Sequence, residues 1–268
     1  MNYDHAYHAG NFSDVFKHIV VLAILRKLQK KATPYCYLET HAGGPYYDLR
    51  GYEANKTGEA LSGIQKIWTL DWQEPIMVDY LNLIRQVSHF NKASACSVYP
   101  GSGAIAAEVM RYHDRCVLQE LAINPFIQLE RFFENNKRVA CYHQDGYAGS
   151  KAFLPPLEKR GLVLIDPPYE EVHEWKKLKE YLSLALKRWP TGIFAIWYPI
   201  KDRWSIDKNL TKLTAELSQP FVRLECCPLL DDVPYRLNGT GMCVINPPWL
   251  LAEDIRPIAN KLAKVFGA

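Results

Sequence analysis

The 268-residue sequence has no C-x-x-C pair, and its seven cysteines, at positions 36, 96, 116, 141, 226, 227 and 243, are an odd number. Structural zinc sites use closely spaced Cys and His ligands, and disulfide frameworks use an even number of cysteines. His5 and His8 form the closest His pair, but no Cys or acidic partner stands at ligand spacing. We therefore expect reduced cysteines, several of them packed in strands, and no metal site.

The sequence also lacks a long apolar run. The longest one near the N-terminus is Ile19 to Leu25, which is too short to span a bilayer. The first eighteen residues hold three His, two Asp and one Lys instead of the apolar centre of a signal peptide. The net charge is only +3, so a surface for nucleic acid would have to be local. We expect a cytoplasmic globular protein that does not contact a membrane.

What the sequence does contain is a series of short apolar strands. We predict strands over residues 35–40, 115–120, 138–143, 161–165, 192–199, 221–228 and 241–247. Because helical segments separate the earlier strands, most of the sheet should be parallel. The last two strands have no helix between them, so one of them should run antiparallel. The predicted fold class is α/β, with a seven-stranded, mostly parallel sheet.

Residues 50–96 show no strand pattern and predict amphipathic helices over 58–70 and 75–90. We expect a helical insertion subdomain at 50–96 inside a discontinuous catalytic domain formed by 1–49 and 97–268. Near the N-terminus, Ser13 is predicted to cap a helix with one apolar face that ends in the basic run 26–31. Lys17 and His18 lie in its second turn, either on the surface or facing a ligand.

The most informative stretch follows the predicted strand at 161–165. Asp166-Pro167-Pro168-Tyr169 ends this strand, and its two prolines stiffen the chain. In an open α/β sheet, ligands bind at the carboxyl ends of the strands. Asp166 and the Pro167 carbonyl are acceptors, and Tyr169 offers a flat ring. Their complement is a planar ring with an amino group, such as adenine.

This motif predicts an amino-methyltransferase that uses S-adenosylmethionine. An exocyclic amine is a poor nucleophile because its lone pair is delocalised into the ring. Two acceptors that hold its hydrogens favour a pyramidal nitrogen with the lone pair directed at the methyl group. Negative charge nearby also stabilises the cation that forms during transfer. We assign orientation to Asp166 first and proton removal second.

Acidic residues at other strand ends could hold the methyl donor. Glu39 lies at the end of the first strand, and the loop His41-Ala42-Gly43-Gly44 follows it, although this loop lacks a full G-x-G pattern. A ribose-binding acid is expected about 20 residues after such a loop. Glu120 lies 77 residues after Gly43, and the insertion explains the excess. We predict that Glu120 accepts the ribose hydroxyls and that Asp145 accepts the adenine amine.

A second copy of the Pro-Pro motif follows the last predicted strand. Asn246-Pro247-Pro248-Trp249 could also present a carbonyl acceptor and an aromatic ring. The copy at 166–169 should lie beside the first strand, whereas the copy at 246–249 should lie away from the glycine loop. We therefore interpret the second copy as structural.

Several of these segments together resemble a known family, the bacterial 23S ribosomal RNA adenine-N6 methyltransferases of the RlmJ (YhiR) type. The resemblance covers nearly the whole chain and is carried by residues 3–18, 40–43, 99–102, 161–169, 197–199 and 246–249. It implies a Rossmann-like methyltransferase fold with a small helical insertion. The implied substrate is one adenine of 23S ribosomal RNA, at position 2030. We expect the protein to act as a monomer.

The resemblance also implies roles for individual residues. Asp166 is the implied catalytic residue, with Pro167 and Tyr169 beside it. The implied cofactor contacts are His18, His41, Ser102, Glu120, Asp145, Gly146 and Asp166. Tyr3 corresponds to the aromatic that meets the RNA, with His5 and Lys17 as companions. A flipped adenine could stack on Tyr169, and phosphate contacts could come from residues 26–31, Lys56, Lys66 or Arg236.

Two other functions share parts of this pattern. A DNA adenine-N6 methyltransferase uses the same motif, but residues 50–96 leave little room for a domain that reads a DNA target. A non-catalytic RNA-binding protein could keep the fold, but an intact Asp166, Tyr169, Glu120 and Asp145 argue against this. Whether the substrate is naked RNA or an assembled subunit is open.

Overall fold

We describe the protein from a computed structural model, which covers residues 4–88, 95–171, 173–233 and 235–268. Seven strands form one sheet in the order β5-β4-β1-β6-β7-β9-β8. Their bounds are β1 Cys36–Glu39, β4 Arg115–Glu120, β5 Val139–His143, β6 Gly161–Ile165, β7 Ile193–Ile200, β8 Phe221–Cys226 and β9 Gly239–Ile245. This is the doubly wound order of a Rossmann-like fold with the last strand inserted before the edge. The predicted fold class is confirmed.

The strand directions agree with the prediction as well. β1 runs parallel to β4 and β6, and β6 runs parallel to β7. β9 is antiparallel to both of its neighbours, β7 and β8. The carboxyl ends of β1, β4, β5, β6, β7 and β8 therefore share one edge of the sheet, and β9 ends at the opposite edge.

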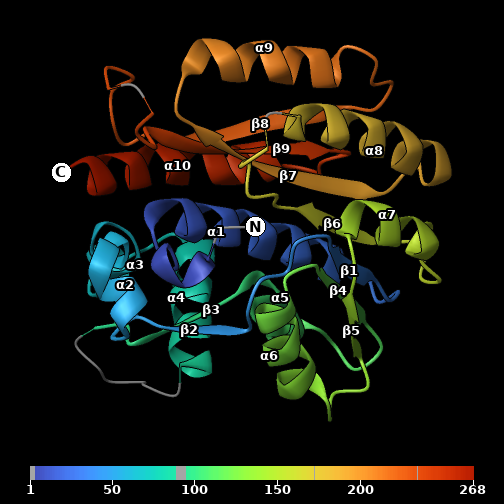
Figure 1. Ribbon diagram of the computed structural model, residues 1–268, viewed down its shortest axis with the longest axis horizontal. Helices are drawn as coiled ribbons and strands as arrows, with labels where there is room; N and C mark the ends of the chain where they lie inside the picture. The colour runs from blue at the N-terminus through green and yellow to red at the C-terminus, as the bar shows by residue number, and fades with distance from the viewer. Residues whose placement is uncertain (1–3, 89–94, 172, 234) are drawn as a thin grey trace.

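Helices cover both faces of the sheet (Figure 1). One face packs against α1 Phe12–Gln29, α5 Ser102–Val109, α6 Ile123–Phe133 and α10 Leu251–Gly267. The other face packs against α8 Glu174–Arg188 and α9 Arg203–Thr214. Successive strand residues alternate between the two cores: Leu162 and Leu164 face the first, whereas Val163 and Ile165 face the second. In the described part of the chain, no helix is both long and apolar enough to cross a membrane.

The first helix differs from the prediction in two respects. Its N-cap is Asn11, whose side chain accepts from the Asp14 N–H at 2.9 Å, so the prediction of Ser13 as the cap is wrong. Ser13 lies inside the helix and donates to Thr240 Oγ1 at 2.7 Å. Every residue from Phe12 to Leu25 is buried, because α1 lies between the sheet and helices of the 52–87 region. The expected polar face does not exist, and Lys17 and His18 are interior residues.

The region between the first two main-sheet strands is helical, as predicted. It contains α2 Tyr52–Thr57, η2 Glu59–Ser62, α3 Ile64–Trp68 and α4 Pro75–Val87, and a short antiparallel pair flanks it, β2 Tyr46–Asp48 with β3 Val98–Pro100. The helix predicted over 58–70 is divided at Gly63, and residues 89–94 lie outside the described residues. The buried side chains of α3 and α4 join the same core as α1. The domain boundaries at 50 and 96 stay a prediction.

The remaining short elements lie at the edge where the parallel strands end. The 3-10 helix η1 His5–Tyr7 precedes α1, and α7 Gly146–Gly149 and η3 Ser150–Phe153 follow β5. They place the N-terminal segment and the loop after β5 near the carboxyl ends of β1 and β6.

Candidate active site

The Asp166-Pro167-Pro168-Tyr169 motif leaves the sheet at the carboxyl end of β6, directly beside β1. Leu164 of β6 pairs with Glu39 of β1. Tyr169 adopts a left-handed backbone conformation with φ of 52°, and its hydroxyl donates to the Trp197 carbonyl at 2.7 Å. Its ring packs against Trp197 and against Trp175, with centroids 5.8 and 5.2 Å away. The motif is therefore held in one conformation by β7 and α8.

Asp166 is paired with a lysine from α1. Lys17 Nζ lies 2.5 Å from Asp166 Oδ2 and 2.8 Å from Asp14 Oδ1. The Lys17 side chain is only 5% exposed. Burial alone would lower the pKa of Lys17, but the two carboxylates raise it well above its usual 10.5. Lys17 is therefore a charged interior residue that bridges two carboxylates.

Asp14 connects this pair to the N-terminal segment. Its Oδ2 lies 2.9 Å from His5 Nε2 and accepts from the Gly10 N–H at 3.0 Å. Burial alone would raise the pKa of Asp14, but His5 and Lys17 hold it well below 3.8. Asp14 lies in the first turn of α1 and was not among the predicted site residues. The i,i+3 spacing of Asp14 and Lys17 can be seen in the sequence, whereas nothing in the sequence signals the contact of Lys17 with Asp166, 149 residues away.

The residues expected to meet RNA are only partly described. His5 and Lys17 both belong to the chain of contacts that ends at Asp166. Tyr3 lies outside the described residues. Their contact with RNA stays a prediction.

Glu120 ends β4 beside the glycine loop that follows β1. Its Oε2 accepts from the Gly43 N–H at 2.8 Å across 77 residues of sequence, and its Oε1 accepts from the Ala122 N–H at 2.7 Å. Gly43 has a φ of 64°, which favours glycine. Each carboxylate oxygen keeps further acceptor capacity. The proximity predicted from the insertion length is therefore confirmed.

Asp145 lies just after β5, the strand next to β4 in the sheet. Its Oδ1 accepts from the Ala148 N–H at 2.9 Å and caps α7, while the residue itself is exposed. Gly146 approaches the first loop so closely that a Cβ on it would lie 1.8 Å from the Thr40 carbonyl oxygen. The loops after β1, β4 and β5 are thus packed together, with acceptors that remain available to a ligand.

Two of the expected cofactor residues are covered in this structure. His18 is 1% exposed, and its Nδ1 lies 2.9 Å from the Tyr99 hydroxyl. Burial and the charge of Lys17 lower the pKa of His18 to about 3, so its ring is neutral. Ser102 is 4% exposed, and its hydroxyl donates to Glu39. Both lie beneath the site, and a direct contact with a cofactor stays a prediction.

The loop after β1 contains two further groups with shifted pKa values. Burial lowers the pKa of His41 to about 4, against the opposing effect of Asp166. Burial raises the pKa of Glu39 to about 8, although hydrogen bonds from Ser102 and Tyr37 oppose the shift. At neutral pH, His41 is uncharged and Glu39 holds a proton. Glu39 was expected at the end of the first strand beside a cofactor, but here it is fully buried and bonded to Ser102 and Tyr37.

The second Pro-Pro copy lies at the other edge of the sheet. Ile245, the last residue of β9, pairs with Phe194 near the start of β7. Asn246 uses its side-chain amide to donate to the carbonyls of Pro190 and Gly192, both at 2.8 Å. Trp249 is 84% exposed. As predicted, this copy lies away from the glycine loop.

Most of the basic residues considered for phosphate contacts are engaged within the protein. Arg26 binds Asp79 through two nitrogens, and Lys27 lies 2.6 Å from Asp254. Lys66 donates to the Phe266 carbonyl, Arg236 pairs with Asp232, and Lys56 lies over the rings of Tyr7 and Tyr52. A role for any of them in RNA binding stays a prediction. Among the described residues, no group of three His, Cys, Asp or Glu could hold a metal ion.

Comparison with known proteins is consistent with this geometry. Residues 32–268 match the family model described as "Ribosomal RNA large subunit methyltransferase D, RlmJ". The chain belongs to this family. The resemblance noted in the sequence is therefore confirmed.

Two curated relatives cover nearly the full chain. A protein of Escherichia coli K12 named "Ribosomal RNA large subunit methyltransferase J" is 36% identical over 258 residues, 96% of this chain and 91% of that protein. A protein of the same name from Haemophilus influenzae is 36% identical over 266 residues, 99% of this chain and 94% of that protein. The solved structure of LPL1258 from Legionella pneumophila is 34% identical with a TM-score of 0.87, and covers 97% of this chain and 94% of its own.

Proposed function

We propose that this protein is an S-adenosylmethionine-dependent methyltransferase that methylates the exocyclic N6 amine of one adenine in 23S ribosomal RNA. Membership of the RlmJ family supports the ribosomal RNA substrate. One observation in the fold carries the amine chemistry. Asp166 and the Pro167 carbonyl leave β6 at the carboxyl edge, beside the strand whose glycine loop contacts Glu120.

The residues at the ends of β1, β4 and β5 fit a nucleoside cofactor. Glu120 is oriented by two backbone N–H groups and keeps acceptor capacity for a pair of ribose hydroxyls. Asp145 uses one oxygen to cap α7 and leaves the other for an adenine amine. Bound S-adenosylmethionine would supply a methyl group already activated by the sulfonium. His41, neutral because of its burial, adds no positive charge that would repel this cation.

Asp166 is arranged to receive an amine. Lys17 occupies Oδ2, and no hydrogen bond to Oδ1 from another described residue is present. Oδ1 and the Pro167 carbonyl can each accept one hydrogen of the amine, which directs the nitrogen lone pair away from the ring plane. Asp14, Lys17 and Asp166 together carry a formal charge of −1. A positive charge that develops on the nitrogen is therefore stabilised.

The test is transfer of a tritiated methyl group to three substrates: naked 23S ribosomal RNA, assembled large subunits and genomic DNA. We expect incorporation into ribosomal RNA and recovery of the label as N6-methyladenosine after digestion to nucleosides. Label in DNA alone, or on another atom of the base, would refute the proposal. Calorimetric titration with S-adenosylmethionine separates an inactive protein that still binds the donor from one that does not.

A further inference from the structure

The edge of the sheet that carries Asp166 extends well beyond it on one side. Ile165, the residue before Asp166, pairs with Ile196 of β7. β7 then continues for four residues to Ile200, which is roughly 13 Å at about 3.3 Å per residue. β9 accompanies it, and Ile200 pairs with Gly239. The paired strands β7 and β9 therefore extend beyond the end of β6, next to the proposed methyl-transfer site. α9 begins soon after β7 ends.

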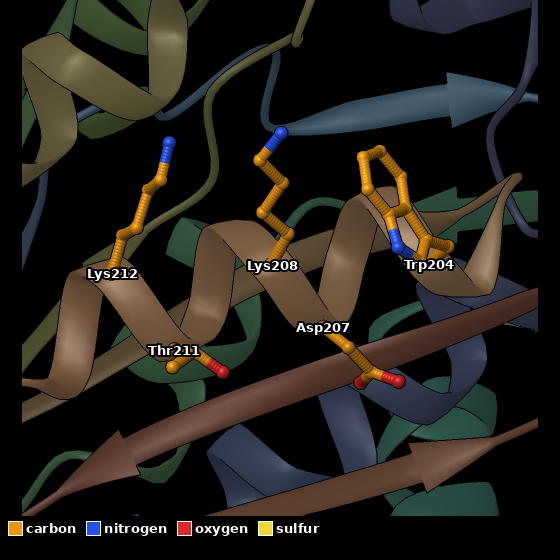
Figure 2. A pocket seen from close by; sticks show the side chains of 5 residues that line it. All are labelled: Trp204, Asp207, Lys208, Thr211 and Lys212. Atoms are coloured by element: carbon orange, nitrogen blue, oxygen red, sulfur yellow. The ribbon is translucent and has the colours of Figure 1, made fainter.

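The outer face of α9 combines an aromatic ring with lysines. Trp204, Lys208 and Lys212 recur every four residues, and Figure 2 shows them side by side on one face of the helix. Trp204 is 69% exposed, and Lys208 Nζ lies 4.5 Å from its ring centroid. The three side chains line an open hollow together with Asp207 and Thr211. We call Lys201, Trp204, Lys208 and Lys212 the α9 ledge.

The acidic side chains near the α9 ledge have partners within the protein, whereas the lysines of the ledge do not pair with acids in the described part of the chain. Asp207 lies 2.6 Å from Arg223, and Asp232 lies 2.8 Å from Arg236. Asp202 caps the Ser205 N–H, and Asp231 accepts from the Arg203 N–H and from Asn238. Among the described residues, Lys201, Lys208 and Lys212 form no ion pair with an acid, and the nearby acids Asp207 and Asp232 pair with arginines. The acids are used within the protein, whereas the lysine charges are left for an external partner.

We propose that the α9 ledge is a second contact surface for the RNA substrate, where the lysines meet phosphates and Trp204 stacks on an unpaired base. This inference rests on the proposed function, because it takes ribosomal RNA as the partner. Unmatched lysines beside an exposed aromatic ring are the groups that bind single-stranded RNA. α9 begins at the edge that carries Asp166 and runs back along the sheet towards the start of β8, so nucleotides next to a flipped adenine would reach Trp204 first and Lys212 last. The loop after β8 adds Tyr235, 91% exposed, at this edge.

The experiment compares two triple variants of the full-length protein. The first is Trp204→Ala with Lys208→Gln and Lys212→Gln. The matched control is Trp249→Ala with Lys137→Gln and Lys187→Gln, which changes the same residue types on the surface of the opposite edge. The affinity for naked 23S ribosomal RNA is measured by filter binding over a range of salt concentrations, without S-adenosylmethionine. The affinity for S-adenosylmethionine, measured by calorimetry, reports whether each variant keeps its fold.

We expect the ledge variant to lose roughly tenfold or more in RNA affinity, mainly from the lost stacking. The slope of log affinity against log salt should fall by about 1.4, since two phosphate contacts are lost. Affinity for S-adenosylmethionine and both properties of the control should stay unchanged. Unchanged RNA affinity in the ledge variant, or an equal loss in the control, would overturn the inference.

The two proposals fail in different ways. If the wild-type protein binds RNA through the ledge but transfers no methyl group to it, the proposed function fails and the ledge stands. If the wild-type protein methylates 23S ribosomal RNA and the ledge variant binds it normally, only the ledge assignment fails.

Discussion

At the scale of single residues, Asp166 and Asn246 occupy the same position in two similar motifs but have different surroundings. Asp166 is paired with a buried lysine at the carboxyl edge of the parallel strands. Asn246 is tied by two hydrogen bonds to the carbonyls of Pro190 and Gly192 at the opposite edge. The first residue has an acceptor left for a substrate, whereas the second is used to close a turn.

We expect Asp166→Ala to abolish methyl transfer, because the amine loses an acceptor and Lys17 loses a partner. Asn246→Ala should keep most of the transfer but lower the free energy of unfolding by about 1–3 kcal/mol, since two carbonyls lose their donor. Tritiated methyl transfer and urea unfolding measure the two effects. The opposite pattern, with transfer lost in Asn246→Ala and kept in Asp166→Ala, would contradict the assignment.

Glu39 should give the protein a pH-dependent stability. Its pKa is about 8 in the folded protein, compared with about 4.5 for an exposed glutamate, so the folded state binds one more proton between these values. This contribution to stability is fully present below about pH 4.5 and is lost as the pH rises through about 8, by at most about 1.4 kcal/mol per pH unit. Glu39→Gln should flatten this part of the curve. Urea unfolding of both proteins from pH 5 to 9 tests it, and parallel curves would show that Glu39 is ionised in the folded state.

At the scale of elements, the helical region between β1 and β4 contacts the N-terminal segment. Glu59 of η2 accepts from the Asn11 side chain at 2.9 Å and contacts His8 Nδ1 at 2.8 Å. The Ile64 N–H donates to the Gly10 carbonyl at 2.8 Å. Asn11 caps α1, the helix that carries Asp14 and Lys17. The helical region therefore supports the helix that carries Lys17, the lysine that contacts Asp166.

We expect Glu59→Gln to weaken methyl transfer through the position of α1, with a smaller effect on affinity for S-adenosylmethionine. The hydrogen bond and charge of Glu59 raise the pKa of His8 above 6.5, although burial opposes this shift. Burial alone would raise the pKa of Glu59, but the hydrogen bond and charge of His8 lower it below 4.5. The ion pair therefore contributes between the pKa of Glu59 and the pKa of His8. It is lost as the pH falls below the pKa of Glu59 or rises above the pKa of His8.

The measurement is the ratio of wild-type to variant transfer rate at pH 6 and pH 9. The ratio should be larger at pH 6, where the ion pair exists. Leu61→Ala, an exposed change in the same element, is the control. A ratio that does not depend on pH would show that the ion pair of Glu59 with His8 does not position α1 for methyl transfer.

At the scale of the whole molecule, the proposed cofactor site joins the loops after three strands. Glu120 holds Gly43, and Gly146 packs directly on the Thr40 carbonyl. A ligand that contacts these loops in the folded state only must stabilise the entire sheet.

Saturation with S-adenosylmethionine at 100 times its dissociation constant should therefore raise the free energy of unfolding by about 2.7 kcal/mol. Thermal unfolding with and without the ligand measures this as a higher midpoint. The shift should vanish in Glu120→Ala and persist in Glu130→Ala, an exposed glutamate on α6. An equal shift in Glu120→Ala would place the cofactor elsewhere.

Much of this protein can be predicted from its sequence. The strands have local apolar patterns, and the Pro-Pro motif marks the end of one of them. Gly43 and Glu120 are far apart in the sequence because a helical region lies between them. They meet in the structure because β1 and β4 are adjacent. The sequence itself therefore determined the fold class and the edge of the sheet at which the Asp166 motif lies.

Only the tertiary structure decided which side chains act together. The contact of Lys17 with Asp166 depends on how α1 packs across the sheet, which no local pattern encodes. The same packing buries both faces of α1 and makes His18 an interior residue. The α9 ledge depends on the extension of β7 beyond β6, which is a property of strand register. Register and packing arise from contacts between distant segments, so they are decided by the folded molecule as a whole.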